Sequence, residues 1–351
     1  MRTFLSVVSA LSILAAVDGS VIEKRQCQAT LNTALTVATT MQAHYFNTGT
    51  GQYNGGSLWT DANTLEDLHN LMLATGTDQF AARLHIGTAF WVEVTDDALW
   101  VVLALWKIAD YKIARGLSAT PYLNSALTIY NIIAGQWDNT CGGGVWWSTA
   151  HTYKNSITNE LFLLVSATGA LNFPTQAAFL TNANLAWNWL KNSGLRNSAG
   201  LWNDGLTQDG TCKNNGQTTW TYNQGVIASG LSALSADATI KTMSTNNILR
   251  ESCDNAAAGG AVCNQDQQIF KGIWTKSVQY YLDRANDPAR NAKYSAYLGS
   301  QSSAVIHFAT DAAGDPGSVW YAPNAGGSIW TPKTSASGLE AHIAAAKYGP
   351  C

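Results

Sequence analysis

Residues 98–109 read ALWVVLALWKIA, an apolar run with a single charge. On a helix, these side chains are apolar on nearly every face. Residues 161–170, LFLLVSATGA, show the same pattern. A helix that is apolar all round is buried on all sides. The two segments therefore predict central helices that other helices enclose.

Helical periodicity continues along most of the chain, and strand-like alternation is scarce. The segments at 28–46 and 174–193 carry polar stripes, which are typical of outer helices. About twelve helices are expected, at 28–46, 61–75, 78–92, 95–115, 120–135, 153–170, 174–193, 219–235, 236–251, 264–285, 287–311 and 334–347.

The loops before alternate helices share a composition. Each is rich in Gly and Trp and runs into a polar cluster, as in GGSLWTDANTLEDL (residues 55–68) and CGGGVWWSTAHTYKNSITNELF (residues 141–162). Six inner and six outer helices would bring these loops to one end. The expected fold is an all-α (α/α)6 barrel with a catalytic cleft at that end. A solenoid is disfavoured because no clear fixed-period repeat is present.

The first residues are not expected to be part of the fold. A basic start and a short apolar run predict a signal peptide over residues 1–19. A short pro-segment over 20–25 ends in Lys24-Arg25, a dibasic processing site. Residues 26–351 contain no Pro/Ser-rich linker and are expected to form one catalytic domain. No anchor signal is recognised at the C-terminus, so a soluble, secreted protein is expected.

Secretion makes disulfides the default for the six cysteines. Proximity in sequence favours Cys253 with Cys263, and the other pairings stay open. No spacing typical of a zinc site is present, so no metal or other cofactor is expected.

Composition excludes some partners and favours another. The net charge of −3 gives no basic face for nucleic acid or an anionic membrane. Fourteen Trp and thirteen Tyr occur beside many neutral hydrogen-bonding residues. This mixture suits a neutral polyol such as a sugar, although more than half of the rings are expected in the core.

Asp96 and Asp97 stand directly before the central apolar helix. Acids in a first turn stabilise a helix in proteins of every function, with Thr95 as the cap. Catalysis is the alternative, since a central helix should begin in the cleft. Retaining glycoside hydrolysis needs an ionised and a protonated carboxyl about 5 Å apart. Repulsion would raise the pKa of one acid and the helix dipole would lower both, and the sequence leaves the balance open.

Several segments in order resemble glycoside hydrolase family 76, the endo-α-1,6-mannanases with an (α/α)6 barrel. They are TDDALWVVLALWKIADY, GGGVWWSTAHTYKNSITNELFLLVSA, WTYNQGVIASGL, FKGIW and SGLEAHIAAA, and the resemblance extends from about Cys27 to Lys347. It implies that Asp96 is the nucleophile and Asp97 the general acid/base. The family's usual YDDxLWW is altered here, because Thr95 precedes the pair and Val101 follows Trp100.

Further cleft candidates lie near the starts of other inner helices. Each has a structural alternative: a cap, a core ring, a turn, or an ion pair in the case of Glu66 and Glu160. Gln224 and His151 are weaker candidates of the same kind. The expected sugar-binding residues are Trp59, Asn63, Trp100, Trp146, Trp147, Lys154, Asn155, Asn159, Asp204, Tyr222 and Asn223.

The sequence thus predicts a retaining endo-acting glycosidase that cleaves α-1,6-mannosidic linkages in mannan or cell-wall mannoprotein. We expect it to be an extracellular or cell-wall monomer whose partner is α-1,6-linked mannan or a mannooligosaccharide. Two alternatives stay open. One is a wall transglycosylase acting on the mannose core of GPI anchors, and the other is a non-catalytic mannan-binding protein.

Overall fold

The computed structural model describes residues 26–81, 94–230, 233–254, 262–322 and 327–351. The signal peptide and pro-segment expected over residues 1–25 lie outside these ranges. Eleven α-helices occur in the described part. They are α1 (Gln28–Tyr45), α2 (Leu58–Thr75), α3 (Thr95–Ala114), α4 (Thr120–Ala134), α5 (Ser156–Asn172), α6 (Ala177–Asn192), α7 (Thr221–Gly230), α8 (Ala233–Thr242), α9 (Phe270–Ala285), α10 (Pro288–Ala304) and α11 (Pro332–Tyr348).

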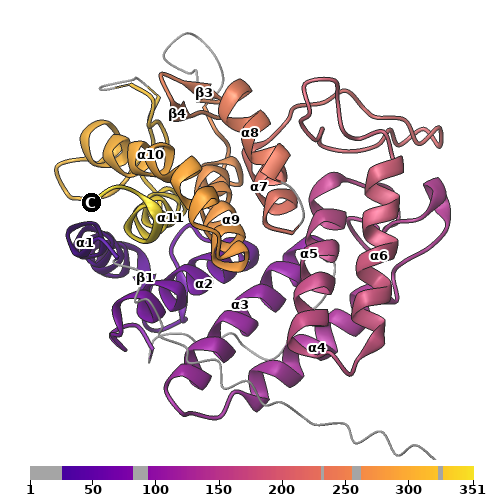
Figure 1. Ribbon diagram of the computed structural model, residues 1–351, viewed down its shortest axis with the longest axis horizontal. Coiled ribbons are helices and arrows are strands. Elements are labelled where there is room, and N and C mark those ends of the chain that lie inside the picture. The colour runs from indigo at the N-terminus through magenta and orange to yellow at the C-terminus, as the bar shows by residue number, and fades with distance from the viewer. Residues whose placement is uncertain (1–25, 82–93, 231–232, 255–261, 323–326) are drawn as a thin grey trace, which may run out of the picture.

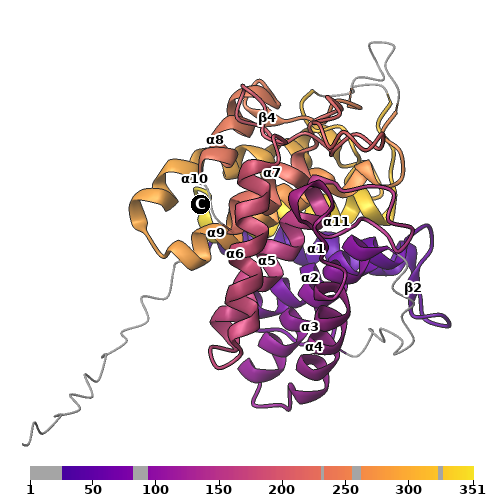
Figure 2. The same ribbon diagram turned by 90° about the vertical axis from the view of Figure 1, so that its right-hand side faces the viewer.

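Six of these helices form a closed inner ring. In order they are α2, α3, α5, α7, α9 and α11; each packs on the next, and α11 returns to α2. Outside the ring, α1 and α10 pack on α11, α4 on α3, α6 on α5 and α8 on α7 (Figure 1). Figure 2 shows one inner and outer pair, α5 and α6, running side by side. The (α/α)6 barrel predicted from the sequence is confirmed.

Local capping defines the starts of three inner helices, α2, α5 and α11. Ser57 before α2 and Thr331 before α11 each form a capping box with the residue three positions on. Asn155 accepts the N–H of Thr158 at the start of α5 (3.3 Å). Gly76 ends α2 at φ +75°, a conformation that glycine adopts without strain. These caps set the residues at which α2, α5 and α11 begin.

Some predicted boundaries were wrong. The helix expected over 236–251 ends at Thr242, and a hairpin of β3 (Ser244–Thr245) and β4 (Ile248–Leu249) follows. Its turn holds Asn246 and Asn247 at positive φ, as two-residue hairpins prefer. A second hairpin joins β1 (Phe46–Asn47) to β2 (Gln52–Tyr53).

The helix predicted over 78–92 falls mostly outside the described residues.

Three disulfides connect the six cysteines. The predicted Cys253–Cys263 bond is confirmed, and the others are Cys141–Cys212 and Cys27–Cys351. The last joins the residue before α1 to the C-terminal residue, and so ties the two ends of the described domain together. Across the described ranges, the helices are too short or too polar to cross a bilayer.

Candidate active site

A cavity of about 690 Å³ opens where the inner helices begin. Helices α2, α3, α5, α7 and α9 all contribute residues from their first turn or from the loop just before it. Eight of the predicted site residues line this cavity. They are Trp59, Asp96, Asp97, Trp100, Trp147, Asn155, Asp204 and Tyr222.

Asp96 and Asp97 lie in the first turn of α3 and both face the cavity. The N-cap is Val94 and not Thr95, because the extended Val94 backbone pairs with Ser148. The N–H of Thr95 then donates to the carbonyl of Trp147 (2.8 Å). This link fixes the start of α3, and hence the two acids, against the loop that carries Trp147.

Both carboxyl groups hold protons more strongly than ordinary aspartates. Burial, followed by the neighbouring Asp97, raises the pKa of Asp96 well above its usual range. The backbone N–H groups of the two residues act in the opposite direction but are outweighed. Burial, followed by Asp266, raises the pKa of Asp97 to about 7. Burial and repulsion therefore exceed the effect of the helix N-terminus, which resolves the balance that the sequence left open.

Aromatic rings form much of the cavity wall. Trp59 packs on Trp100 with ring centroids 6.1 Å apart. Tyr222 stacks on Phe270 at 3.8 Å with an interplanar angle of 6°. The Trp147 side chain is 39% exposed and lines the same cavity. Its free face offers the flat apolar surface against which a sugar ring can stack.

Asp204 is held in place by two donors. The hydroxyl of Tyr153 and Nε1 of Trp220 (3.1 Å) both donate to its carboxylate. Tyr153 reaches it only because residue 205 is glycine: a Cβ there would lie 2.3 Å from the tyrosine oxygen. Gly205, which pairs with Asn155, thus leaves the space that lets Tyr153 support a carboxylate in the cavity lining.

Comparison with known proteins places this geometry in a family. The sequence profile of Glycosyl hydrolase family 76 matches residues 29–347, which is nearly all of the described domain. The chain belongs to glycosyl hydrolase family 76. The resemblance seen in the sequence is thereby confirmed.

Curated relatives of this family 76 chain are fungal. The chain is 25% identical over 233 residues to the mannan endo-1,6-alpha-mannosidase DCW1 of Candida albicans, covering 59% of this chain and 50% of that one. It is 27% identical over 210 residues to the mannan endo-1,6-alpha-mannosidase DFG5 of Saccharomyces cerevisiae, covering 53% and 45%. The matched regions span about half the length of these relatives.

Solved structures share the fold. The α-1,6-mannanase GH76A of Salegentibacter sp. HEL1_6, an inactive variant in complex with α-1,6-mannotriose, superimposes with a TM-score of 0.76 at 18% identity, covering 90% of this chain and 99% of that one. Dfg5 from Chaetomium thermophilum in complex with glucosamine gives 0.69 at 16% identity, covering 91% and 89%.

Three amides expected in the cleft lie elsewhere in this family 76 barrel. Asn63 bonds the carbonyl of Trp59 (3.0 Å) and the ammonium of Lys276 (2.9 Å). Asn159 bonds both the N–H (2.8 Å) and the carbonyl (3.0 Å) of Val145. Asn223 is fully buried and is not among the residues that line the cavity. All three stand on inner helices but face neighbouring backbone or the barrel interior rather than the cavity.

Lys154 and Trp146 support a loop instead of lining the cavity. The lysine Nζ lies 2.6 Å from Asp138 and donates to the carbonyls of Thr140 (2.7 Å) and Gly143 (2.8 Å). Trp146 donates to the other oxygen of Asp138 (2.7 Å). Together they shape the Gly-rich turn that precedes Trp147.

The weaker candidates also have structural partners or lie below the cavity. His151 stacks on Trp146, and Gln224 bonds the backbone of Trp202. Glu66 pairs with Lys276 at 3.0 Å. Glu160 is completely buried, and this burial raises its pKa well above the usual range.

The sequence reading missed several cavity residues. Asp266, Gln267 and Asn264 come from the polar run NQDQQ that precedes the FKGIW segment. That run is polar like the other cleft loops but lacks their Gly and Trp, so it gave only a weak signal. Tyr153 gave none, because a tyrosine in a loop has no distinctive spacing.

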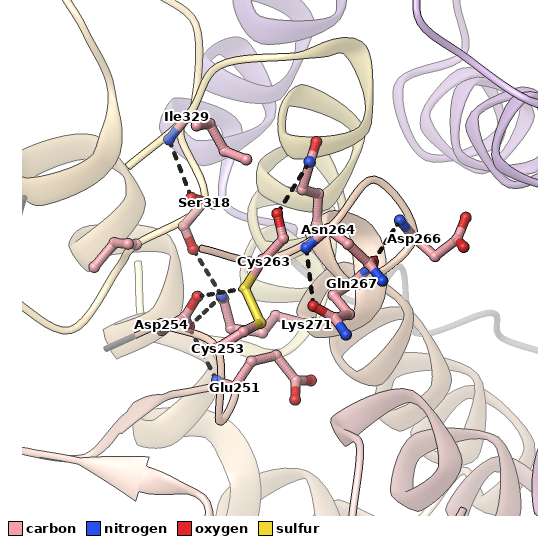
Figure 3. Close-up of a disulfide and its surroundings, with 12 residues drawn as sticks. Glu251, Cys253, Asp254, Cys263, Asn264, Asp266, Gln267, Lys271, Ser318 and Ile329 are labelled. Carbon is pink, nitrogen blue, oxygen red and sulfur yellow. Dashed lines mark hydrogen bonds and ion pairs between the residues drawn. A yellow bond between two sulfur atoms is a disulfide. The ribbon is translucent and has the colours of Figure 1, made fainter. Parts of the chain in front are cut away.

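Within the described ranges, one group of side chains has the spacing of metal ligands: Cys253, Asp254 and Cys263. The two sulfur atoms are bonded to each other, and the Asp254 carboxylate pairs with Lys271 (Figure 3). These groups therefore serve as a structural link rather than as ligands.

Proposed function

We propose that this protein is a retaining, endo-acting glycosidase that cleaves α-1,6-mannosidic linkages in mannan or cell-wall mannoprotein. The observation that carries the proposal is the pair of adjacent carboxyls, Asp96 and Asp97, buried in a cavity with aromatic walls. The Salegentibacter mannanase supports it, because its inactive variants carry changes at two consecutive aspartates and bind α-1,6-mannooligosaccharides.

The proposed reaction has two displacements. The Asp96 carboxylate attacks the anomeric carbon, and Asp97 gives its proton to the departing oxygen as the glycosidic bond breaks. Asp97, now ionised, takes a proton from water as the water oxygen replaces Asp96 on the sugar. The mannose is released with its original anomeric configuration, and both carboxyls return to their starting states.

Asp96 must lose its proton to act as the nucleophile, although its burial favours the protonated form. Two effects favour ionisation when substrate is bound. A proton on Asp97 removes the repulsion between the two groups, and positive charge develops on the sugar beside Asp96 in the transition state. The backbone N–H groups at the start of α3 already stabilise the ionised form.

Incubation with linear α-1,6-mannotetraose tests the proposed function. We expect shorter oligosaccharides, with the new reducing ends first appearing as the α anomer in time-resolved NMR. Oligosaccharides longer than the substrate would instead favour the transglycosylase. Binding without any product, seen by calorimetry, would indicate a mannan-binding protein.

The rate should fall on the alkaline side of neutrality. Asp97 must be protonated to act as the acid, and its pKa is raised to about 7. Because the protonated form disappears as pH rises through this value, kcat/KM is expected to drop about tenfold per unit above it. A pH–rate profile from 5 to 9 measures this; a flat profile up to pH 9 would contradict the role of Asp97.

We further propose that the protein acts outside the cell, as a monomer without a cofactor. The three disulfides support an oxidising compartment. Neutral mannan fits a cavity that offers aromatic faces and amide and carboxylate oxygens rather than cationic groups.

A further inference from the structure

We propose that Asp266 is a positioning residue: its carboxylate, held at the cavity wall by Trp59, keeps on Asp97 the proton that the leaving oxygen receives. This inference rests on the proposed function and identifies a third acid for it. The sequence analysis did not select Asp266, which lies 169 positions after Asp97 in the numbering.

All the charged side chains in the described lining of the cavity are acidic. Its described lining contains four carboxyl groups, Asp96, Asp97, Asp204 and Asp266, and no Lys, Arg or His. The two carboxylate oxygens of Asp204 accept hydrogen bonds from Tyr153 and Trp220. The remaining three acids have no cation in the cavity, so they cannot all be ionised at low cost. Burial and the neighbouring acids accordingly raise the pKa values of Asp96 and Asp97.

Asp266 is fixed as a hydrogen-bond acceptor. Nε1 of Trp59 donates to Oδ1 of Asp266 (3.2 Å). The indole itself is held between Trp100 and Phe270, with centroids 6.1 and 6.4 Å away. An indole N–H can only donate, so Oδ1 of Asp266 is the acceptor in this bond. Asp266 is therefore a fixed carboxylate in the same cavity as the pair on α3.

The loop around Asp266 is a compact turn. The side-chain oxygen of Asn264 accepts the N–H groups of Asp266 and Gln267, both at 3.0 Å. In return, the side chain of Gln267 accepts the N–H of Asn264 (2.9 Å). Figure 3 shows these three residues directly after Cys263. The backbone of Asp266 is thus held from both sides of the turn.

One disulfide and one ion pair anchor this turn to the rest of the domain. The Cys253–Cys263 disulfide lies immediately before Asn264. Lys271, in the first turn of α9, pairs with Asp254 and donates to the carbonyl of Ser318 (2.7 Å), as Figure 3 shows. Both ion-pair partners are buried, so this contact is screened little by solvent. The position of Asp266 is therefore set by the scaffold and does not depend on substrate.

Other ionisable groups near Asp97 do not take over the role proposed for Asp266. On its own helix Asp96 is the neighbour, and from α7 Tyr222 faces the same cavity. From α11, Lys333 lies near both Asp266 and Asp61. The shift of the Asp97 pKa to about 7 agrees, since Asp266 is its largest cause after burial.

The test is the pH profile of Asp266→Asn, which keeps the shape and the acceptor oxygen but removes the charge. Loss of a nearby negative charge lowers the pKa of Asp97, so the alkaline limb of kcat/KM is expected to move about one unit toward acid. Asp266→Glu keeps the charge and should keep the limb near 7. Asp61→Asn is the matched control: it removes an acid beside the same lysine but outside the cavity lining, and should not move the limb.

A second readout does not depend on activity. Carbon-13 NMR of aspartate-labelled protein, with Asp97→Asn to assign the signal, gives the Asp97 pKa directly in wild type and in Asp266→Asn. A lower value in the variant is expected, and thermal melting confirms that it is folded. An unchanged Asp97 titration in a folded variant would overturn the inference. If wild type failed to cleave mannan while the NMR shift appeared, the proposed function alone would fail.

Discussion

Asp97→Asn is expected to regain activity on a substrate with an activated leaving group, whereas Asp96→Asn is not. Both variants should lose on the order of 10⁴-fold in turnover of α-1,6-mannotetraose, because each lacks one of the two carboxyls of the reaction. On a 2,4-dinitrophenyl α-mannooligosaccharide the leaving oxygen needs no proton. The first step then requires Asp96 only.

Azide distinguishes the two roles by product stereochemistry. In Asp97→Asn, azide can attack the sugar bound to Asp96, and the expected product is the α-mannosyl azide with retained configuration. In Asp96→Asn, azide can only take the place of the missing nucleophile, which gives the β-azide. Asp110→Asn is the matched control, since it makes the same change on α3 at a half-exposed position 14 residues from Asp96.

The outcome bears on the protonation of the pair. In the sugar-free protein, burial raises the pKa of both Asp96 and Asp97, whereas the proposed roles require Asp96 to be ionised and Asp97 to be protonated. If the two variants exchanged their behaviour, Asp97 would be the nucleophile and Asp96 the general acid/base. Full activity in both variants would show that Asp96 and Asp97 only stabilise the start of α3 and take no part in catalysis.

The parts of the fold that were predicted correctly are those with one strong pattern. The apolar runs that became α3 and α5 could hardly be anything but buried helices, and the loops that precede inner helices share their Gly, Trp and polar composition. Helix α2 shows the limit. Its buried residues include Glu66, Asp67 and His69, and no periodicity indicates that this polar face meets a partner inside the barrel.

Part of the site was also predicted correctly because it follows one strong sequence pattern. The first-turn position of Asp96 and Asp97 on a central helix places them at the cleft. Amides one turn further, such as Asn63 and Asn159, occupy the same kind of sequence position, yet they bond backbone and buried side chains. Which way such a residue points depends on the neighbouring helix, and this information lies in another segment of the chain. Asp266 was missed because its link to Trp59 joins segments 207 positions apart.

Lys276→Met is expected to cost about 3–5 kcal/mol of unfolding free energy, because it leaves buried acids without their cation. The Lys276 ammonium lies inside the ring, 2.7 Å from Asp67 and 3.0 Å from Glu66 of α2. Glu340 of α11 adds a third carboxyl to the cluster. One lysine of α9 thus connects the three helices at which the ring closes.

A surface lysine provides the control. Lys293 pairs with Asp237 at 2.5 Å, but its side chain is 51% exposed. Lys293→Met removes the same charge and introduces the same side chain, and should cost less than about 1 kcal/mol. Urea unfolding followed by circular dichroism compares both variants with wild type. Equal losses in the two variants would show that the interior cluster is not held together by its lysine.

The cost of Lys276→Met should also depend on pH in a definite direction. Burial, together with Asp67, already raises the pKa of Glu340 well above its usual range, and burial raises that of Asp67. Without the lysine these folded-state values rise further. Carboxyls with raised pKa values stabilise the fold at low pH, and this stability is lost as pH rises through the folded value. The destabilisation is therefore expected to be larger at pH 8 than at pH 5, and the opposite order would mean that Lys276 acts by packing and not by charge.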